Sequence, residues 1–142
     1  MRSASKRWHR RLHAFVRYAW AAPNTAVGLV LALAACASGG RLRVVEGVFE
    51  AHGGLAAWLL RHCVPLERGA ASLTLGHAVI GRDAACLATW REHERVHVAQ
   101  YERWGPFFVP AYFAATAMAV FSGGHYYRDN RFERDAERAS RA

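Results

Sequence analysis

The chain has 142 residues, which is enough for one domain with a single hydrophobic core. Hydrophobic residues make up 53% of the chain, and this composition excludes an intrinsically disordered protein. The formal net charge of +8 indicates an anionic partner, either nucleic acid or lipid headgroups. Nucleic acid is disfavoured, because no recognisable module combines a basic helix face with interleaved stacking aromatic residues.

The N-terminal region combines a basic cluster with an uncharged segment. The basic residues of this cluster are Arg2, Lys6, Arg7, Arg10, Arg11 and Arg17, and all of them precede the first acidic residue. Residues 18–40 follow without a single charge, and the order predicts a membrane helix with its positive flank in the cytoplasm. A buried core helix is the alternative, because Pro23 and Asn24 shorten the continuous apolar helix.

The cysteines are three in number, Cys36, Cys63 and Cys86, and show no paired spacing. They therefore predict neither a disulfide framework nor a cysteine-based zinc site. Cys36 follows an apolar run and precedes Ala-Ser-Gly-Gly, so processing as a bacterial lipoprotein at Cys36 is a further alternative. The run is long for a signal peptide and contains Pro23, which favours the membrane helix.

The next region, residues 41–80, predicts a small sheet. Residues 41–52 are rich in Val and Phe with near-alternating polarity, which is typical of one or two short strands. Residues 55–62 predict a short helix or loop that ends before Pro65. Residues 71–80 alternate apolar and small polar side chains and predict one strand, which leads into a helix capped by Asp83.

The second half of the chain predicts three helices. Over residues 84–103, side chains that would share one helix face recur at spacings of three and four. This pattern predicts one long helix, which Gly105 and Pro106 end. Residues 106–121 are apolar and uncharged and predict a second helix. After a loop at residues 122–125, Asn130 begins a strongly polar final helix.

The predicted long helix contains the motif HExxH in His93, Glu94 and His97. Two histidines four residues apart lie on one helix face, so both imidazoles can reach a single Zn²⁺ ion at about 2.0–2.1 Å. The glutamate beside the first histidine is then placed as a general base for a metal-activated water. The alternative is a solvated helix face in which acidic and basic residues, including Glu94 and Arg95, form spaced ion pairs.

A third zinc ligand must come from another element. The acidic residues of the final helix are the natural source, and we expect Glu133 to bind the metal. Glu137 or Asp135 would then accept a hydrogen bond from the second N–H of a ligating imidazole. His125 and His77 are the alternative third ligands.

Residues 93–100 resemble the HExxHxxQ of zincin-like bacterial domains such as the DUF4157 group. The later Glu-x-x-Ala-Glu resembles the third-ligand helix of gluzincin metallopeptidases, which implies His93 and His97 as ligands, Glu94 as base and Glu133 as third ligand. A wider pattern, covering most of the chain, resembles a family of small uncharacterised bacterial membrane-associated proteins, at residues 76–77, 93–100, 102–106, 110–112 and 127–133.

The sequence departs from the zinc peptidases at two places. Charged Glu92 and Arg95 lie beside and within the HExxH motif, where those enzymes generally keep uncharged residues. Glu137 occupies the position at which gluzincins usually have Asp. Both departures weaken the prediction of peptidase activity more than that of metal binding.

Membrane topology limits how the predicted ligands can meet. If residues 18–40 and 104–124 both spanned a bilayer, His97 and Glu133 would lie on opposite sides of a hydrocarbon core about 30 Å thick. We therefore expect residues 106–121 to fold back as a core or interfacial helix, which Pro106 and Pro110 favour.

The predicted fold is α+β and mainly helical: a membrane helix within residues 1–40, then a zincin-like minimal domain over residues 41–142 with a small β-sheet and the HExxH helix. The predicted function is a zinc-dependent hydrolase at the cell membrane, peptidase-like, in contact with membrane lipid. By analogy with zincins, the strand at residues 71–80 would pair with an extended peptide substrate. The alternatives are a noncatalytic membrane protein with structural zinc and a membrane adaptor without metal.

Overall fold

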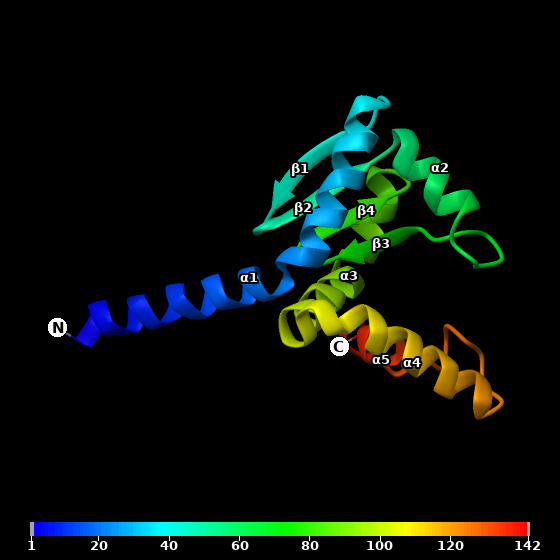
Figure 1. Cartoon of the computed structure of the whole chain (residues 1–142). Helices are drawn as coiled ribbons and strands as arrows, with labels where there is room; N and C mark the ends of the chain where they lie inside the picture. The colour runs from blue at the N-terminus through cyan, green and yellow to red at the C-terminus, as the bar shows by residue number, and fades with distance from the viewer. Residues whose placement is uncertain (1, 142) are drawn as a thin grey trace.

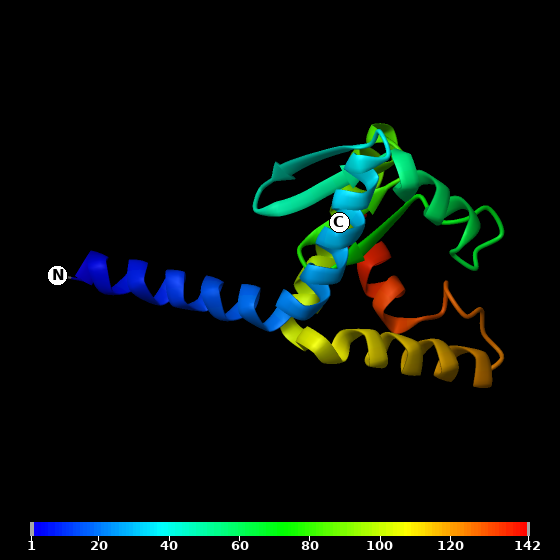
Figure 2. The same cartoon turned by 45° about the horizontal axis from the view of Figure 1, so that its top comes forward.

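The computed structural model describes residues 2–141, and their side chains from Leu12 onward. The first element, α1 (Arg2–Ala37), continues through Pro23 and bends near the middle (Figure 1). An interior proline bends a helix because it lacks an N–H donor and its ring clashes with the preceding turn. The first half of α1 extends away from the rest of the chain, and the second half packs on the sheet (Figures 1 and 2). The basic side chains predicted to flank the membrane helix, from Arg2 to Arg11, lie outside the described side chains.

The sheet has four short strands: β1 (Arg41–Val45), β2 (Val48–His52), β3 (Ser72–Leu75) and β4 (Ala78–Gly81). Their order is β1-β2-β4-β3, with β2 and β4 parallel and the other two pairs antiparallel. The predicted strands at residues 41–52 are confirmed as β1 and β2, and residues 55–62 fall in a helix, α2 (Gly54–His62). The chain is thus α+β and mainly helical, as predicted.

The prediction of one strand over residues 71–80 is wrong, because the chain reverses in the middle of this segment. Gly76 has a φ of 63°, a left-handed conformation that glycine adopts without steric cost. Leu75 pairs with Ala78, so Gly76 and His77 form a two-residue hairpin loop. As a consequence β4 lies inside the sheet, and β3 is an edge strand, on the opposite side of the sheet from β1.

Helices cover both faces of the sheet. The second half of α1 packs on one face with α2, through small residues such as Ala32 and Ala35 against Ala51 and Ile80. On the other face α3 (Ala84–Trp104) packs Leu87 and Val98 against Val48 and Val79. The alternation of side chains along each strand separates these two cores. The sheet is therefore the middle layer of three.

The approach of α1 to the sheet depends on Gly28. A Cβ added there would lie 2.6 Å from the Cβ of Ala78 and 2.9 Å from the carbonyl oxygen of Leu75. We expect Gly28→Val to lower the free energy of unfolding by about 1–3 kcal/mol through overpacking. Urea denaturation measures the change, and Ala26→Val, at an exposed position of the same helix, is the control. Equal stability of the two variants would contradict this packing.

The helices α3, α4 and α5 begin and end close to the predicted residues. Asp83 caps α3 by accepting a hydrogen bond from the backbone N–H of Cys86, at 2.7 Å. After Trp104 a single turn, η1 (Gly105–Phe107), redirects the chain into α4 (Phe108–Phe121). Asn130 caps α5 (Arg131–Ser140), and its side-chain amide donates to the carbonyl oxygen of Tyr112 and to Oγ1 of Thr116 on α4. Asn130 thereby joins α5 to α4, and α5 returns to pack on α3.

Two helical segments, Leu12–Ala37 and Ala84–Phe121, are long and apolar enough to cross a membrane. Core helices and signal sequences can have the same length and composition. One face of α1 belongs to the core, because Ala21, Ala32 and Ala35 are fully buried. Cys36 lies in the last turn of this helix, so cleavage before Cys36 would remove the residues that cover the sheet.

Candidate metal centre

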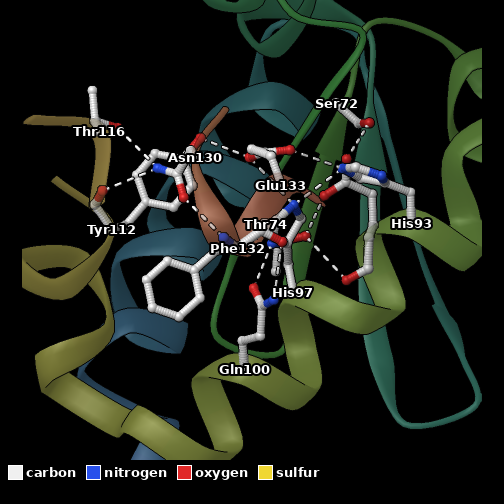
Figure 3. A network of polar contacts seen from close by, with 11 residues as sticks. Ser72, Thr74, His93, His97, Gln100, Tyr112, Thr116, Asn130, Phe132 and Glu133 are labelled. Atoms are coloured by element: carbon white, nitrogen blue, oxygen red, sulfur yellow. Dashed lines mark hydrogen bonds and ion pairs between the residues drawn. The ribbon is translucent and has the colours of Figure 1, made fainter. Parts of the chain in front are cut away.

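Three buried side chains from two helices converge at one point. His93 and His97 come from α3 and Glu133 from α5, and one ligand atom of each lies within 4.8 Å of the others (Figure 3). The Nε2 atoms of the two histidines are 3.1 Å apart. Glu133 places Oε2 at 3.2 Å from Nε2 of His93 and Oε1 at 3.5 Å from Nε2 of His97. This group can hold a metal ion.

The hydrogen bonds around the group leave ligand lone pairs facing one another. Gln100 donates its Nε2 to the carbonyl oxygen of Phe132 at 3.1 Å, which orients its Oε1 as the acceptor for Nδ1–H of His97 at 2.8 Å. Nε2 of a neutral His97 then carries a lone pair directed at His93 and Glu133. Nδ1 of His93 is buried and has no hydrogen-bond partner among the described residues. A cation bound between the three side chains would be coordinated by these imidazole nitrogens and carboxylate oxygens. The three side chains therefore fit a metal ion.

The negative charge of Glu133 is strongly stabilised. Burial alone would raise its pKa, but hydrogen bonds from His93, from the protonated form of His97 and from Tyr112 hold the pKa of the carboxyl well below its usual range. The hydroxyl of Tyr112 donates to Oε1 of Glu133 at 2.6 Å. Burial and the charge of Glu133 raise the pKa values of Tyr112 and Tyr127 in turn. Both phenols therefore keep their protons and remain donors at neutral pH.

The protonation of His97 predicts a pH dependence of metal binding. Burial lowers the pKa of His97, but the hydrogen bond and charge of Glu133 and the charge of Glu94 outweigh burial and raise it. A metal binds the unprotonated imidazole, so protons compete with it. We expect the affinity for Zn²⁺ to fall between about pH 8 and pH 5, and to begin falling at a higher pH than for an ordinary histidine. Chelator-competition titrations measure this, and a constant affinity over that range would contradict it.

Glu94 is buried beside this group and is held by the edge strand. Both oxygens of its carboxylate accept hydroxyl hydrogen bonds, from Ser72 at 2.6 Å and from Thr74 at 2.5 Å. The two donors are two residues apart on β3 and point to the same face of the sheet. Glu94 is therefore not part of a solvated helix face, which was the alternative interpretation of the motif.

Gln100 orients His97, and its loss should weaken metal binding without abolishing it. We expect Gln100→Ala to reduce the affinity for Zn²⁺ about 10- to 100-fold, the usual effect of removing a group that holds a ligating imidazole. Isothermal titration calorimetry measures the affinity. Arg103→Ala, at an exposed position on the same helix, is the control. Equal affinities in both variants would show that Gln100 has no such role.

The two alternative third ligands lie outside the metal group. His77 is buried at the β3–β4 turn, where its Nε2 is 2.9 Å from Oε1 of Glu102 and its ring stacks on Tyr18 at 3.9 Å between centroids. His125 accepts hydrogen bonds from the backbone N–H groups of Tyr127 and Arg128, and so shapes the loop before α5. The contacts of both histidines are with residues outside the metal group.

The other acidic residues of α5 do not contact the ligating imidazoles. Asp135 is exposed, and Glu137 forms an ion pair with Arg141. Nδ1 of His97 points along its own helix to Gln100, three residues later, so its acceptor does not come from α5. The structure thus assigns to Gln100 the role predicted for Asp135 or Glu137.

The charges around the motif point away from the metal group. Arg95 donates to the carbonyl oxygen of Val45 at 2.6 Å, and Arg91 pairs with the buried carboxylate of Glu50 at 2.9 Å. Glu92 is exposed. The helix turn places these residues on other sides of α3 than His93, so the departure from the uncharged pattern does not alter the metal group itself.

A cavity of about 360 Å³ adjoins the metal group. His93, Glu94, His97 and Glu133 form part of its wall, and the edge strand β3 forms another part. The remaining lining is mainly apolar and comes from α4, β3 and the segment after α2, and it includes Leu66, Leu73, Leu75, Phe108, Val109 and Phe113. The arrangement thus combines candidate ligands, a carboxylate and space for an apolar group.

Several residues of the site had no predicted role. Gln100 could have been found, because it lies three residues after His97 and therefore near the same helix face. Ser72 and Thr74 alternate along a strand, but only the fold brings them to Glu94. Tyr112 carries no local signal that it contacts Glu133.

Comparisons of this chain with protein-family models, with curated proteins and with solved structures find no match. The zincin-like assignment made from the motif therefore stays a prediction.

Proposed function

We propose that this protein is a zinc-dependent, peptidase-like hydrolase that acts at a membrane. The observation that carries the proposal is the position of the Glu94 carboxylate beside the buried His93, His97 and Glu133 group, at the wall of an apolar cavity. A general base, a set of ligands and room for a substrate thus occur at one place.

The donor set favours zinc among the common metals. Two imidazoles and one carboxylate are a ligand set of catalytic zinc sites, which leave the fourth position open. Ca²⁺ and Mg²⁺ prefer oxygen ligands and take more of them. Bound zinc supplies two effects, a water with a pKa near 7 and polarisation of a carbonyl group.

The side chains have distinct roles in this proposal. Glu94 accepts the proton of the attacking water and delivers it to the leaving nitrogen, while Ser72 and Thr74 hold its carboxylate in place. Tyr127 lines the cavity with its proton retained, and can donate a hydrogen bond to the oxygen that becomes negative in the transition state. Tyr112 keeps Glu133 oriented.

The substrate is an extended peptide with a large apolar residue next to the cleaved bond. The free edge of β3 offers backbone hydrogen bonds to an added strand. Leu73, Phe108 and Val109 line the adjoining cavity, which is large enough for an aromatic or long aliphatic side chain.

A structural zinc site is the second candidate. One observation favours it: both carboxylate oxygens of Glu94 already accept hydroxyl hydrogen bonds, so Glu94 can also serve only to join α3 to β3. The metal would then link α3 to α5 without chemistry. A measurement of peptide hydrolysis distinguishes the catalytic zinc site from the structural one.

The test is metal analysis of the purified protein together with cleavage of peptides that differ in one residue beside the scissile bond. We expect about one zinc per chain, and cleavage next to Phe or Leu that chelation abolishes and zinc restores. Val109→Trp, which fills the cavity, should reduce cleavage and retain the zinc. Bound zinc without hydrolysis would indicate the structural site, and a protein that binds no zinc would contradict both candidates.

A further inference from the structure

The outward side of α4 is apolar along its whole length. Its exposed positions recur at helical spacing, and the large residues among them include Met118 at 68% and Phe121 at 89% exposure. No charged residue occurs between residues 104 and 127. A helix in contact with water normally has polar residues on this side. The apolar outward side of α4 therefore indicates contact with an apolar partner.

The outward side of α1 has the same character. Its inward side packs small residues on the sheet, while Val27, Val30 and Leu33 are 55%, 66% and 61% exposed on the opposite side. The segment that contains them, residues 18–40, has no charge. In Figure 1, α1 lies in front of the strands and α4 in front of α5, so the uncovered sides of both helices face the same way.

Neither helix can cross a bilayer while the domain stays folded. The second half of α1 is bound to the sheet along its length, and hydrocarbon around an open sheet would leave edge-strand backbone groups without partners. Helix α4 has 14 residues, fewer than the roughly 20 that a span requires. The inner side of α4 also receives the hydrogen bonds of Asn130.

We propose that the uncovered sides of α1 and α4 form one membrane-binding surface that lies in the interfacial layer of an anionic bilayer, with neither helix spanning it. The apolar stripes enter the boundary between headgroups and acyl chains. The basic cluster from Arg2 to Arg17 lies on the same helix as one stripe and attracts anionic headgroups. This surface is formed by residues outside the metal group, so the inference does not depend on zinc.

Flotation with lipid vesicles tests the surface. We expect the full chain to bind vesicles that contain phosphatidylglycerol, and to bind pure phosphatidylcholine vesicles more weakly. Val30→Glu combined with Met118→Glu should reduce the binding constant for vesicles about tenfold or more, because two apolar side chains that would contact lipid are replaced by charged ones. Ala85→Glu combined with Ala88→Glu adds the same charge at exposed positions of α3, on the other face of the sheet, and should leave binding unchanged. Circular dichroism and the midpoint of urea denaturation serve as the measures of folding for both variants.

Three results would overturn the proposal. Equal vesicle binding by both double variants would show that this surface does not meet the bilayer. A dimer in solution that the Val30 and Met118 changes dissociate, without vesicle binding by the wild type, would indicate that a second copy covers the helices. Reporter fusions at the two termini test the topology: we expect both on the same side of the membrane, and opposite sides would show that α1 spans it.

Discussion

Replacing Glu94 with Gln is expected to leave zinc bound and to reduce hydrolysis about 10²- to 10⁴-fold, the usual contribution of a general base. Gln has nearly the same shape as Glu and can still accept a hydrogen bond from Ser72 or Thr74, so the position of the side chain should be preserved. It cannot take a proton from water. The measurements are the zinc content and kcat/KM with an apolar peptide substrate.

Thr74→Val is the matched variant for this experiment. It removes one hydroxyl donor to Glu94 and retains the carboxylate, so we expect a smaller loss of kcat/KM than with Glu94→Gln. Unchanged hydrolysis in Glu94→Gln would exclude Glu94 as the base. Loss of zinc in the same variant would show that Glu94 belongs to the metal group itself.

Removal of the Glu133 carboxylate is expected to have the largest effect on metal binding. Glu133 provides the only charged ligand, and its low pKa keeps it ionised over the whole range in which the protein would be studied. Groups that merely orient a ligand contribute 10- to 100-fold to affinity, so Glu133→Ala should weaken zinc binding by more than about 100-fold. Titration calorimetry with Zn²⁺ measures the loss.

Glu137→Ala provides the matched control, because it removes a carboxylate one turn further along α5 that pairs with Arg141 instead of the histidines. Its zinc affinity should equal that of the wild type. If Glu133→Ala and Glu137→Ala bound zinc equally well, Glu133 would not be a ligand. Circular dichroism of both variants without metal separates a lost ligand from a lost fold.

The helices and most of the metal group could be predicted from the sequence, because the relevant signals are local. Asp83, Gly105 and Asn130 mark helix ends by the chemistry of their own side chains or backbone. The spacing of His93 and His97 places both on one helix face. Glu133 lies on another helix, and it reaches the histidines because α5 returns to pack on α3.

Other features depend on contacts between distant segments. Alternating side chains at residues 71–80 fit a single strand as well as a hairpin, and only the pairing of β3 with β4 places the turn at Gly76. The same pairing makes β3 the edge strand and brings Ser72 and Thr74 to Glu94.

The sequence alone determined that His93 and His97 can bind one metal ion, because imidazoles four residues apart on a helix share one face whatever surrounds them. The tertiary structure decided what holds those residues and what lies beside them: Gln100 for His97, Tyr112 for Glu133, and an apolar cavity along β3. It also decided that one side of the second half of α1 covers the sheet, which the apolar composition of this half could not show. Composition records how apolar a helix is, whereas only packing selects the side that is buried.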